Sequence, residues 1–190
     1  MKATGIVRRI DDLGRVVIPK EIRRNLRIRE GDPLEIFVDR DGEVILKKYS
    51  PIGELGDFAR EYAESINENI GQIVIITDRD NIIAISGGPK KEFMGKAIGR
   101  LVEKSMEERK TILNVHHGQN GGSKEGNIVS DDSGEESYRF MAEIIAPIIS
   151  QGDPIGSVII CDKEGNSEFG VLENKIAETA ASFLARQMEQ

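Results

Sequence analysis

Basic side chains near the start of the chain are spaced so that several share one face of a short helix. At about 100° per residue, four of them fall within a sector of about 100° on a helix that begins after Pro19: Lys20, Arg23, Arg24 and Arg27. The apolar Ile22 and Leu26 lie on the opposite side. Arg23 and Arg27 repel each other across one turn, which favours a polyanion beside them. Arginine binds phosphates and reads guanine edges. The pattern therefore favours nucleic-acid binding, with a merely solvated cationic face as the alternative.

Arg8, Arg9 and Arg15 extend this positive surface into the segments before the helix. Residues 1–50 carry 12 Lys/Arg and 9 Asp/Glu, a net charge of +3, whereas residues 51–190 carry 14 and 24, a net charge of -10. Such a split is typical of a basic binding module joined to an acidic one. The whole-chain charge of -7 does not argue against a nucleic-acid partner, because the partner responds to the local field.

Side chains that could support catalysis or hold a metal form no convincing set. The single Cys161 excludes a disulfide framework and a multi-thiolate metal site, and we expect it to be a small buried apolar residue. His116-His117 is interpreted as a solvated pair, and Ser86-Gly87-Gly88 as a turn without the flanks of a phosphate loop. The paired acids at 131–132 and 135–136 lie in a polar stretch, where solubility explains them. We predict no enzymatic activity, no cofactor and no metal.

The first fifty residues are predicted to form short strands around one helix. Strands are expected at 5–10 and 15–18, separated by the turn 11–14, and the helix should run from Pro19 to about Leu26. Residues 34–39 alternate with period two and return over 44–48 through Asp41-Gly42, a strong hairpin signal. A unit of this size buries too little core by itself. We therefore expect a homodimer that shares one core.

Three motifs of this segment, written TGIVR, LGRVVIP and EIRRNL, begin at Thr4, Leu13 and Glu21. They closely resemble the AbrB family of bacterial transition-state regulators, and the resemblance extends over residues 2–50. It implies a swapped-hairpin dimer that binds double-stranded DNA through arginines. Matched along the motifs, these fall on Arg8, Arg15, Arg23 and Arg24, with Arg9 at a position that is usually basic.

The remainder is predicted to be a second domain, residues 51–190. Ser50-Pro51 should start a helix, whose apolar positions form a seam: Ile52, Leu55, Ala59, Tyr62 and Ile66. A hairpin at 73–85, a helix at 93–109, a polar loop at 114–137, a hairpin at 138–161 and a helix from about Ser167 follow. This order predicts an α+β domain with an antiparallel sheet and flanking helices. The helix from about Ser167 carries a second apolar seam over 169–184. Neither seam has an obvious partner within the domain, so we expect both domains to self-associate.

The join, KKYSPIGELGDFAREYAESI, and the closing AETAASFLARQMEQ closely resemble the sporulation regulators of the same family that carry a C-terminal GAF domain. The resemblance implies a homotetramer held by helices flanking the sheet. It also implies a ligand place between the sheet and a roof at 86–137, for an effector of unknown identity. Two roles stay open for this domain, sensing and assembly alone. A different alternative is an antitoxin-like protein whose acidic domain binds a protein partner.

The chain contains no apolar run near the ~20 residues that span a bilayer, and Met1-Lys2-Ala3-Thr4 leads into charged sequence without an apolar signal core. We expect a cytoplasmic, nucleoid-associated protein with no membrane partner.

Overall fold

The structure is a computed structural model that describes residues 5–54, 56–115, 128–129, 140–162 and 169–189. The chain divides into two compact units, Met1–Tyr49 and Ser50–Gln190, here called the N-unit and the C-unit. The order of elements is the α+β pattern that the sequence predicts. Each unit is described by itself.

The N-unit holds one helix and one hairpin. Helix α1 spans Lys20–Asn25, and strands β1 (Leu34–Val38) and β2 (Val44–Lys48) pair antiparallel. At the hairpin turn, Asp39 Oδ1 accepts hydrogen bonds from the backbone N–H groups of Asp41 (3.0 Å) and Glu43 (2.9 Å). Gly42 has φ +82°, a conformation that glycine adopts without strain. The predicted helix and hairpin are confirmed.

The strands predicted at 5–10 and 15–18 are wrong for the single chain, in which both segments lie outside any strand and every residue in them except the half-buried Ile18 is exposed. A strand needs a neighbour for its backbone N–H and C=O groups, and the hairpin of the same chain does not supply one. The predicted burial of the apolar face of α1 is also wrong for the single chain. Ile22 is half-buried, Leu26 is 58% exposed, and α1 has no buried residue.

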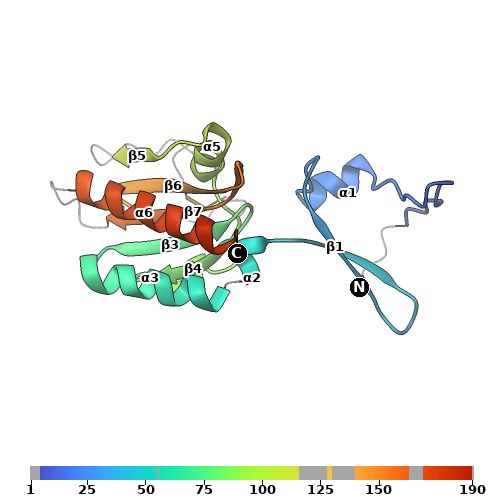
Figure 1. Cartoon of the computed structure of the whole chain (residues 1–190), viewed down its shortest axis with the longest axis horizontal. Coiled ribbons are helices and arrows are strands. Elements are labelled where there is room, and N and C mark those ends of the chain that lie inside the picture. Colours follow the sequence, from blue (N-terminus) through green and yellow to red (C-terminus); the bar gives the residue numbers. More distant parts are fainter. Residues whose placement is uncertain (1–4, 55, 116–127, 130–139, 163–168, 190) are drawn as a thin grey trace. The chain divides into compact units, whose positions relative to one another are not determined.

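The C-unit is built on a five-stranded sheet in the order β4-β3-β7-β6-β5, with every neighbouring pair antiparallel (Figure 1). The strands are β3 Ile73–Asp78, β4 Ile82–Ser86, β5 Ile112–Val115, β6 Ala142–Ser150 and β7 Asp153–Asp162. The helices are α2 Pro51–Glu54, α3 Gly56–Ile70, α4 Lys90–Phe93, α5 Arg100–Glu108 and α6 Val171–Gln187. Both predicted hairpins are confirmed.

Two details of the prediction are wrong. Residues 112–115 form the edge strand β5, whereas the sequence predicts no strand there and places 114–115 in the polar loop. The helix predicted at 93–109 begins only at Arg100. Gly95 has φ +73°, and the backbones of Gly95 and Lys96 exchange hydrogen bonds with Ile82 of β4. Backbone groups that pair with a strand cannot also close helical turns.

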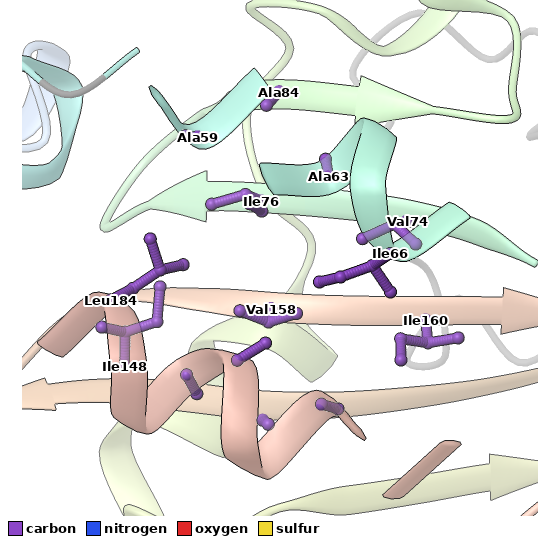
Figure 2. Close-up of a cluster of buried hydrophobic side chains, with 14 of the residues drawn as sticks. Ala59, Ala63, Ile66, Val74, Ile76, Ala84, Ile148, Val158, Ile160 and Leu184 are labelled. Atoms are coloured by element: carbon purple, nitrogen blue, oxygen red, sulfur yellow. The ribbon is translucent and has the colours of Figure 1, made fainter. Parts of the chain in front are cut away.

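Each face of the sheet carries its own apolar core. Helices α3 and α6 cover one face, where Ala59, Ala63, Ile66 and Leu184 pack on Val74, Ile76, Ile148, Val158 and Ile160 (Figure 2). Helices α4 and α5 contribute to the core on the other face, which contains Phe93, Ile98, Val102 and Met106. Both faces of the sheet are therefore covered by apolar side chains of the same unit.

The helical seam has a partner after all. Ile52, Ala59 and Ile66 are buried against the sheet of their own unit, so the expectation that they wait for another chain is wrong. Leu55 lies outside the described residues. The predicted cap is confirmed, since Ser50 Oγ accepts a hydrogen bond from the backbone N–H of Gly53 at 3.1 Å.

Candidate nucleic-acid interface

The five arginines predicted to bind DNA lie on three successive pieces of the N-unit. Arg8 and Arg9 belong to the extended segment 5–10, and Arg15 follows the turn 11–14. Arg23 and Arg24 lie on α1. Four of the five are exposed and Arg23 is half-buried. The structure thus leaves the cationic side chains available to a large ligand.

The first turn of helix α1 fixes the backbone position of Arg23. Pro19 precedes the helix and is buried, and its carbonyl accepts the backbone N–H of Arg23 at 3.0 Å. Arg23 Nε is shielded from solvent and has no hydrogen-bond partner among the described residues. A buried N–H without an acceptor is costly.

The turn before Arg15 is held by one aspartate. Asp11 Oδ1 accepts the backbone N–H groups of Leu13 (3.0 Å) and Arg15 (2.8 Å), and Asp11 Oδ2 accepts Arg15 Nε at 2.8 Å. These hydrogen bonds, first from the backbone and then from the guanidinium of Arg15, lower the pKa of Asp11 below its usual 3.8. Sequence reasoning assigned Asp11 only to a turn. The signal for its wider role is an Asp four residues before an Arg, with Gly14 between them.

The hairpin is tied back to the end of α1 by one lysine. Lys48 Nζ donates to the carbonyl of Arg27 at 2.8 Å and lies 3.5 Å from Asp32 Oδ2. Arg27 itself has φ +52°, just beyond the helix. These contacts connect the hairpin to the helix that carries Arg23 and Arg24.

The N-unit also presents an unusual amount of apolar surface. Its exposed large apolar side chains are Ile6, Val7, Ile10, Leu13, Val16, Val17, Leu26, Ile36, Phe37, Val38, Val44, Leu46 and Tyr49. Val7 is 89% exposed and Val38 is 73% exposed. An apolar surface of this extent usually marks an interaction site.

The C-unit residues weighed as chemical candidates turn out to be structural where they are described. Cys161 is fully buried, as predicted, and burial raises the pKa of its thiol well above the usual value. Gly87 has φ +75° and packs closely against the side chain of Asn67, which accepts a hydrogen bond from Ser86 Oγ (3.3 Å). The Ser86-Gly87-Gly88 segment is therefore a tight turn. His116, His117 and the acids at 131–132 and 135–136 lie outside the described residues.

Two further observations concern the described residues alone. No group of three or more His, Cys, Asp or Glu residues among them is placed to hold a metal ion. None of the helices in that part of the chain is both long and apolar enough to cross a membrane.

Comparison with known proteins decides the family. Residues 54–189 match the family described as "Stage V sporulation protein T C-terminal, transcription factor". Along its whole length the chain is 56% identical to stage V sporulation protein T of Bacillus subtilis (strain 168), over 191 residues and 100% of both proteins. The chain belongs to the stage V sporulation protein T family.

The N-unit of this family member has further relatives. Over 51 residues the chain is 67% identical to the transition state regulatory protein AbrB of B. subtilis, a match that covers 27% of this chain and 52% of AbrB. The resemblance to the AbrB family is confirmed. Residues 7–54 also match the family described as "Antidote-toxin recognition MazE, bacterial antitoxin".

The C-unit of this member of the stage V sporulation protein T family has the GAF fold. It resembles the crystal structure of the GAF domain from Acinetobacter phosphoenolpyruvate-protein phosphotransferase with a TM-score of 0.56 and 13% identity, over 71% of this chain and 82% of that one. Residues 122 to 287 of a methyl-accepting chemotaxis protein give a TM-score of 0.58 at 15% identity, over 72% of this chain and 90% of that one. The predicted fold of this unit is confirmed.

Proposed function

We propose that this chain is a DNA-binding regulator of sporulation genes, in which residues 1–50 bind the duplex and residues 51–190 assemble the protein. One observation carries the proposal. A unit 67% identical to AbrB over 51 residues presents exposed arginines on three neighbouring pieces of chain. The family of the C-unit is described as a transcription factor, and this agrees with a regulatory role rather than an enzymatic one.

The DNA-binding residues in this proposal are Arg8, Arg9, Arg15, Arg23 and Arg24. Guanidinium groups neutralise phosphates and release counterions, and some can also form paired hydrogen bonds with guanine. The preference for particular sequences comes from those arginines that reach base edges.

The N-unit acts as a dimer in this proposal. Its extended segments 5–10 and 15–18 lack strand neighbours within the chain, and its apolar side chains are exposed. A second copy supplies both missing elements, because interleaved hairpins pair the backbones and cover the apolar surface. Dimerisation also doubles the arginines, and the doubled surface matches a duplex better than one copy does.

The C-unit forms the tetramer contact in this proposal, through the outer surface of α3 and α6. Phe58, Tyr62 and Phe183 form an aromatic group there, with ring centroids 5.2 to 6.0 Å apart. Phe183 is 39% exposed and Leu172 is 62% exposed. Replacing Phe183 and Leu172 with Asp should lower the mass measured by light scattering, whereas Asp at the exposed Met94 should not. An unchanged mass in the double variant would reject this surface.

The proposal includes a small-molecule effector of the C-unit, whose chemistry is unidentified. Its place in this proposal is the sheet face against which α4 and α5 pack, because these two helices are described parts of the roof predicted at 86–137. Part of the roof is outside the described residues. A thermal-shift screen of the full chain against cellular metabolites tests this idea. A screen without a stabilising hit, together with full DNA binding after an unrelated tetramer-forming bundle replaces the C-unit, would leave assembly as its role.

The antitoxin-like alternative has one observation in its favour, the match of residues 7–54 to the MazE antitoxin family. That match covers the N-unit, whereas the acidic part matches a transcription-factor family over residues 54–189. Co-purification of a stoichiometric small protein would favour the alternative. We also place the protein in the cytoplasm, associated with the nucleoid, because its DNA partner is there.

The decisive experiment measures DNA binding by the full chain. A genome-wide map of bound sites supplies the operator, and its affinity is then compared with that of the double variant Arg23→Ala/Arg24→Ala. The matched control is Lys91→Ala/Arg100→Ala, which removes the same charge from exposed positions of α4 and α5, away from the proposed tetramer contact. We expect a large loss for the first pair and almost none for the second. Equal affinities for both variants would overturn the assignment of the interface.

A further inference from the structure

Arg15 differs from the other four arginines in how its side chain is held. Its Nε lies 2.8 Å from Asp11 Oδ2, and its side chain is nevertheless 68% exposed. Among the described residues, no hydrogen bond or ion pair reaches the side chains of Arg8, Arg9, Arg23 and Arg24. Arg15 is therefore both exposed and held by a hydrogen bond, whereas the described residues hold none of the other four side chains in that way.

The orienting aspartate is itself rigidly placed by the backbone. Asp11 N–H donates to the carbonyl of Arg15 at 3.0 Å, and Gly14 N–H donates to the carbonyl of Asp11 at 3.0 Å. Gly14 has φ +76°, which allows the tight turn. Asp11 Oδ1 accepts two further backbone N–H groups. One carboxylate thus closes the turn with one oxygen and holds the guanidinium with the other.

We propose that Asp11 is a positioning residue for DNA binding, which holds the Arg15 guanidinium through Nε so that its two terminal nitrogens face a phosphate or a guanine edge. The inference rests on the proposed function of the N-unit. A guanidinium has five donors in a fixed fork, and binding at Nε leaves the terminal pair free. An arginine held in advance loses less rotamer freedom when it binds.

Neutralising Asp11 should change DNA affinity in the direction opposite to that expected from its charge alone. An acidic side chain beside a DNA surface repels phosphates, so its neutralisation should strengthen binding. If Asp11 orients Arg15, its neutralisation weakens binding instead. Asp12 is the matched control, because it is the neighbouring exposed acid and its side chain has no hydrogen bond or ion pair among the described residues.

Asp11→Asn isolates the contact with the guanidinium. Asparagine keeps an oxygen for the two backbone N–H groups but presents an NH2 group to Arg15 Nε, where donor faces donor. Operator affinity of the full chain should fall about fivefold per dimer. Asp12→Asn should leave affinity the same or slightly higher. Arg15→Ala removes the charge itself from both protomers and, where the contact is with a phosphate, should lower the slope of log affinity against log salt by about 1.8.

The same substitution is then made in an Arg15→Ala background. Positioning requires that Asp11→Asn has no unfavourable effect there, because the residue that it orients is absent. An equal loss in both backgrounds would mean that Asp11 serves only the turn, and this would overturn the inference. Asp11→Asn binding as tightly as Asp12→Asn would overturn it too. If the unaltered chain fails to bind DNA, the proposed function itself fails, and that outcome is distinct.

Discussion

The two units of this protein differ in how far a single chain buries their apolar side chains. The C-unit encloses an apolar core on each face of its sheet, from Ile52 to Leu184. In the described part of the N-unit, Pro19 is the one buried residue, and the apolar side chains are largely exposed. The C-unit is therefore a fold that one chain completes. The N-unit is a fold that one chain leaves open, and we expect a second copy to complete it.

Charge follows the same division. The N-unit carries its basic side chains on the open surface and has a net charge of +3, whereas the C-unit has a net charge of -10. An open apolar surface beside a cationic one suits a dimer on DNA, since one surface is covered by the partner chain and the other by phosphates. The two units should therefore respond differently to salt, to truncation of apolar side chains and to dilution.

The largest effect is expected from salt on DNA binding. If six or more of the eight guanidinium groups contributed by Arg8, Arg15, Arg23 and Arg24 of a dimer contact phosphates, operator affinity should fall about 10³-fold or more between 50 and 200 mM salt. Fluorescence anisotropy of a labelled operator measures this. Lys91→Ala/Arg100→Ala in the C-unit should not change the slope of log affinity against log salt. A salt-independent affinity would contradict the phosphate contacts.

A core substitution in the C-unit comes next. Ile159 is fully buried between β3 and β6 neighbours, so Ile159→Ala should lower the free energy of unfolding by about 2 to 5 kcal/mol. Met94, which is 47% exposed, is the control, and Met94→Ala should cost less than about 0.5 kcal/mol. Urea unfolding followed by circular dichroism compares them. Equal costs would mean that the C-unit core is not the closed one described here.

An exposed residue of the N-unit sharpens the comparison further. Leu26 is 58% exposed in the single chain, and a side chain that stayed so exposed would be almost neutral when truncated. If a second copy covers it, Leu26→Ala should cost about 2 kcal/mol or more. The loss should grow as the protein is diluted, because association stabilises the fold by mass action. A concentration-independent change below about 0.5 kcal/mol would place Leu26 outside the dimer core.

The junction between the units gives a smaller effect. Ser50 Oγ accepts the backbone N–H of Gly53 at 3.1 Å and lies 3.2 Å from Asp78 Oδ2. Ser50→Ala removes the cap and should lower the free energy of unfolding of the C-unit by about 1 kcal/mol. Ser50→Thr keeps the hydroxyl and should lose less. Thermal melts of the three proteins decide, and identical melts for Ser50→Ala and the unaltered chain would contradict the role of the cap.

The smallest effect concerns acid. Hydrogen bonds from the backbone and side chain of Arg15 lower the pKa of Asp11 below 3.8. A carboxyl whose pKa is depressed in the folded state stabilises the fold above its unfolded pKa, and this contribution is lost as pH falls through the folded pKa. The carboxyl carbon of Asp11, followed by NMR, should therefore titrate below 3.8. Arg15→Ala should shift its midpoint upward, and an unchanged midpoint would contradict the assigned cause.

Local patterns predicted the elements that their own residues complete. The hairpin of β1 and β2 follows from alternation around Asp41-Gly42, and the start of α2 follows from Ser50-Pro51. The cationic spacing on α1 and its neighbours was readable because charge and helical period are properties of sequence alone. Burial could not be predicted in the same way, because α1 has no buried residue in the single chain although the sequence predicts that one of its faces is buried.

What the sequence by itself determined is the division into a basic and an acidic half, the family and the arginines that we propose as the DNA surface. Only the tertiary structure decided which apolar side chains have partners. The seam of α3 packs on its own sheet because that sheet offers a complementary apolar face, whereas segments 5–10 and 15–18 find no strand beside them. The tertiary structure also decided that Asp11 accepts a hydrogen bond from the guanidinium of Arg15. Such contacts depend on how the backbone brings together residues that are distant in the sequence or lie on either side of a turn. The periodicity of a short segment does not predict them.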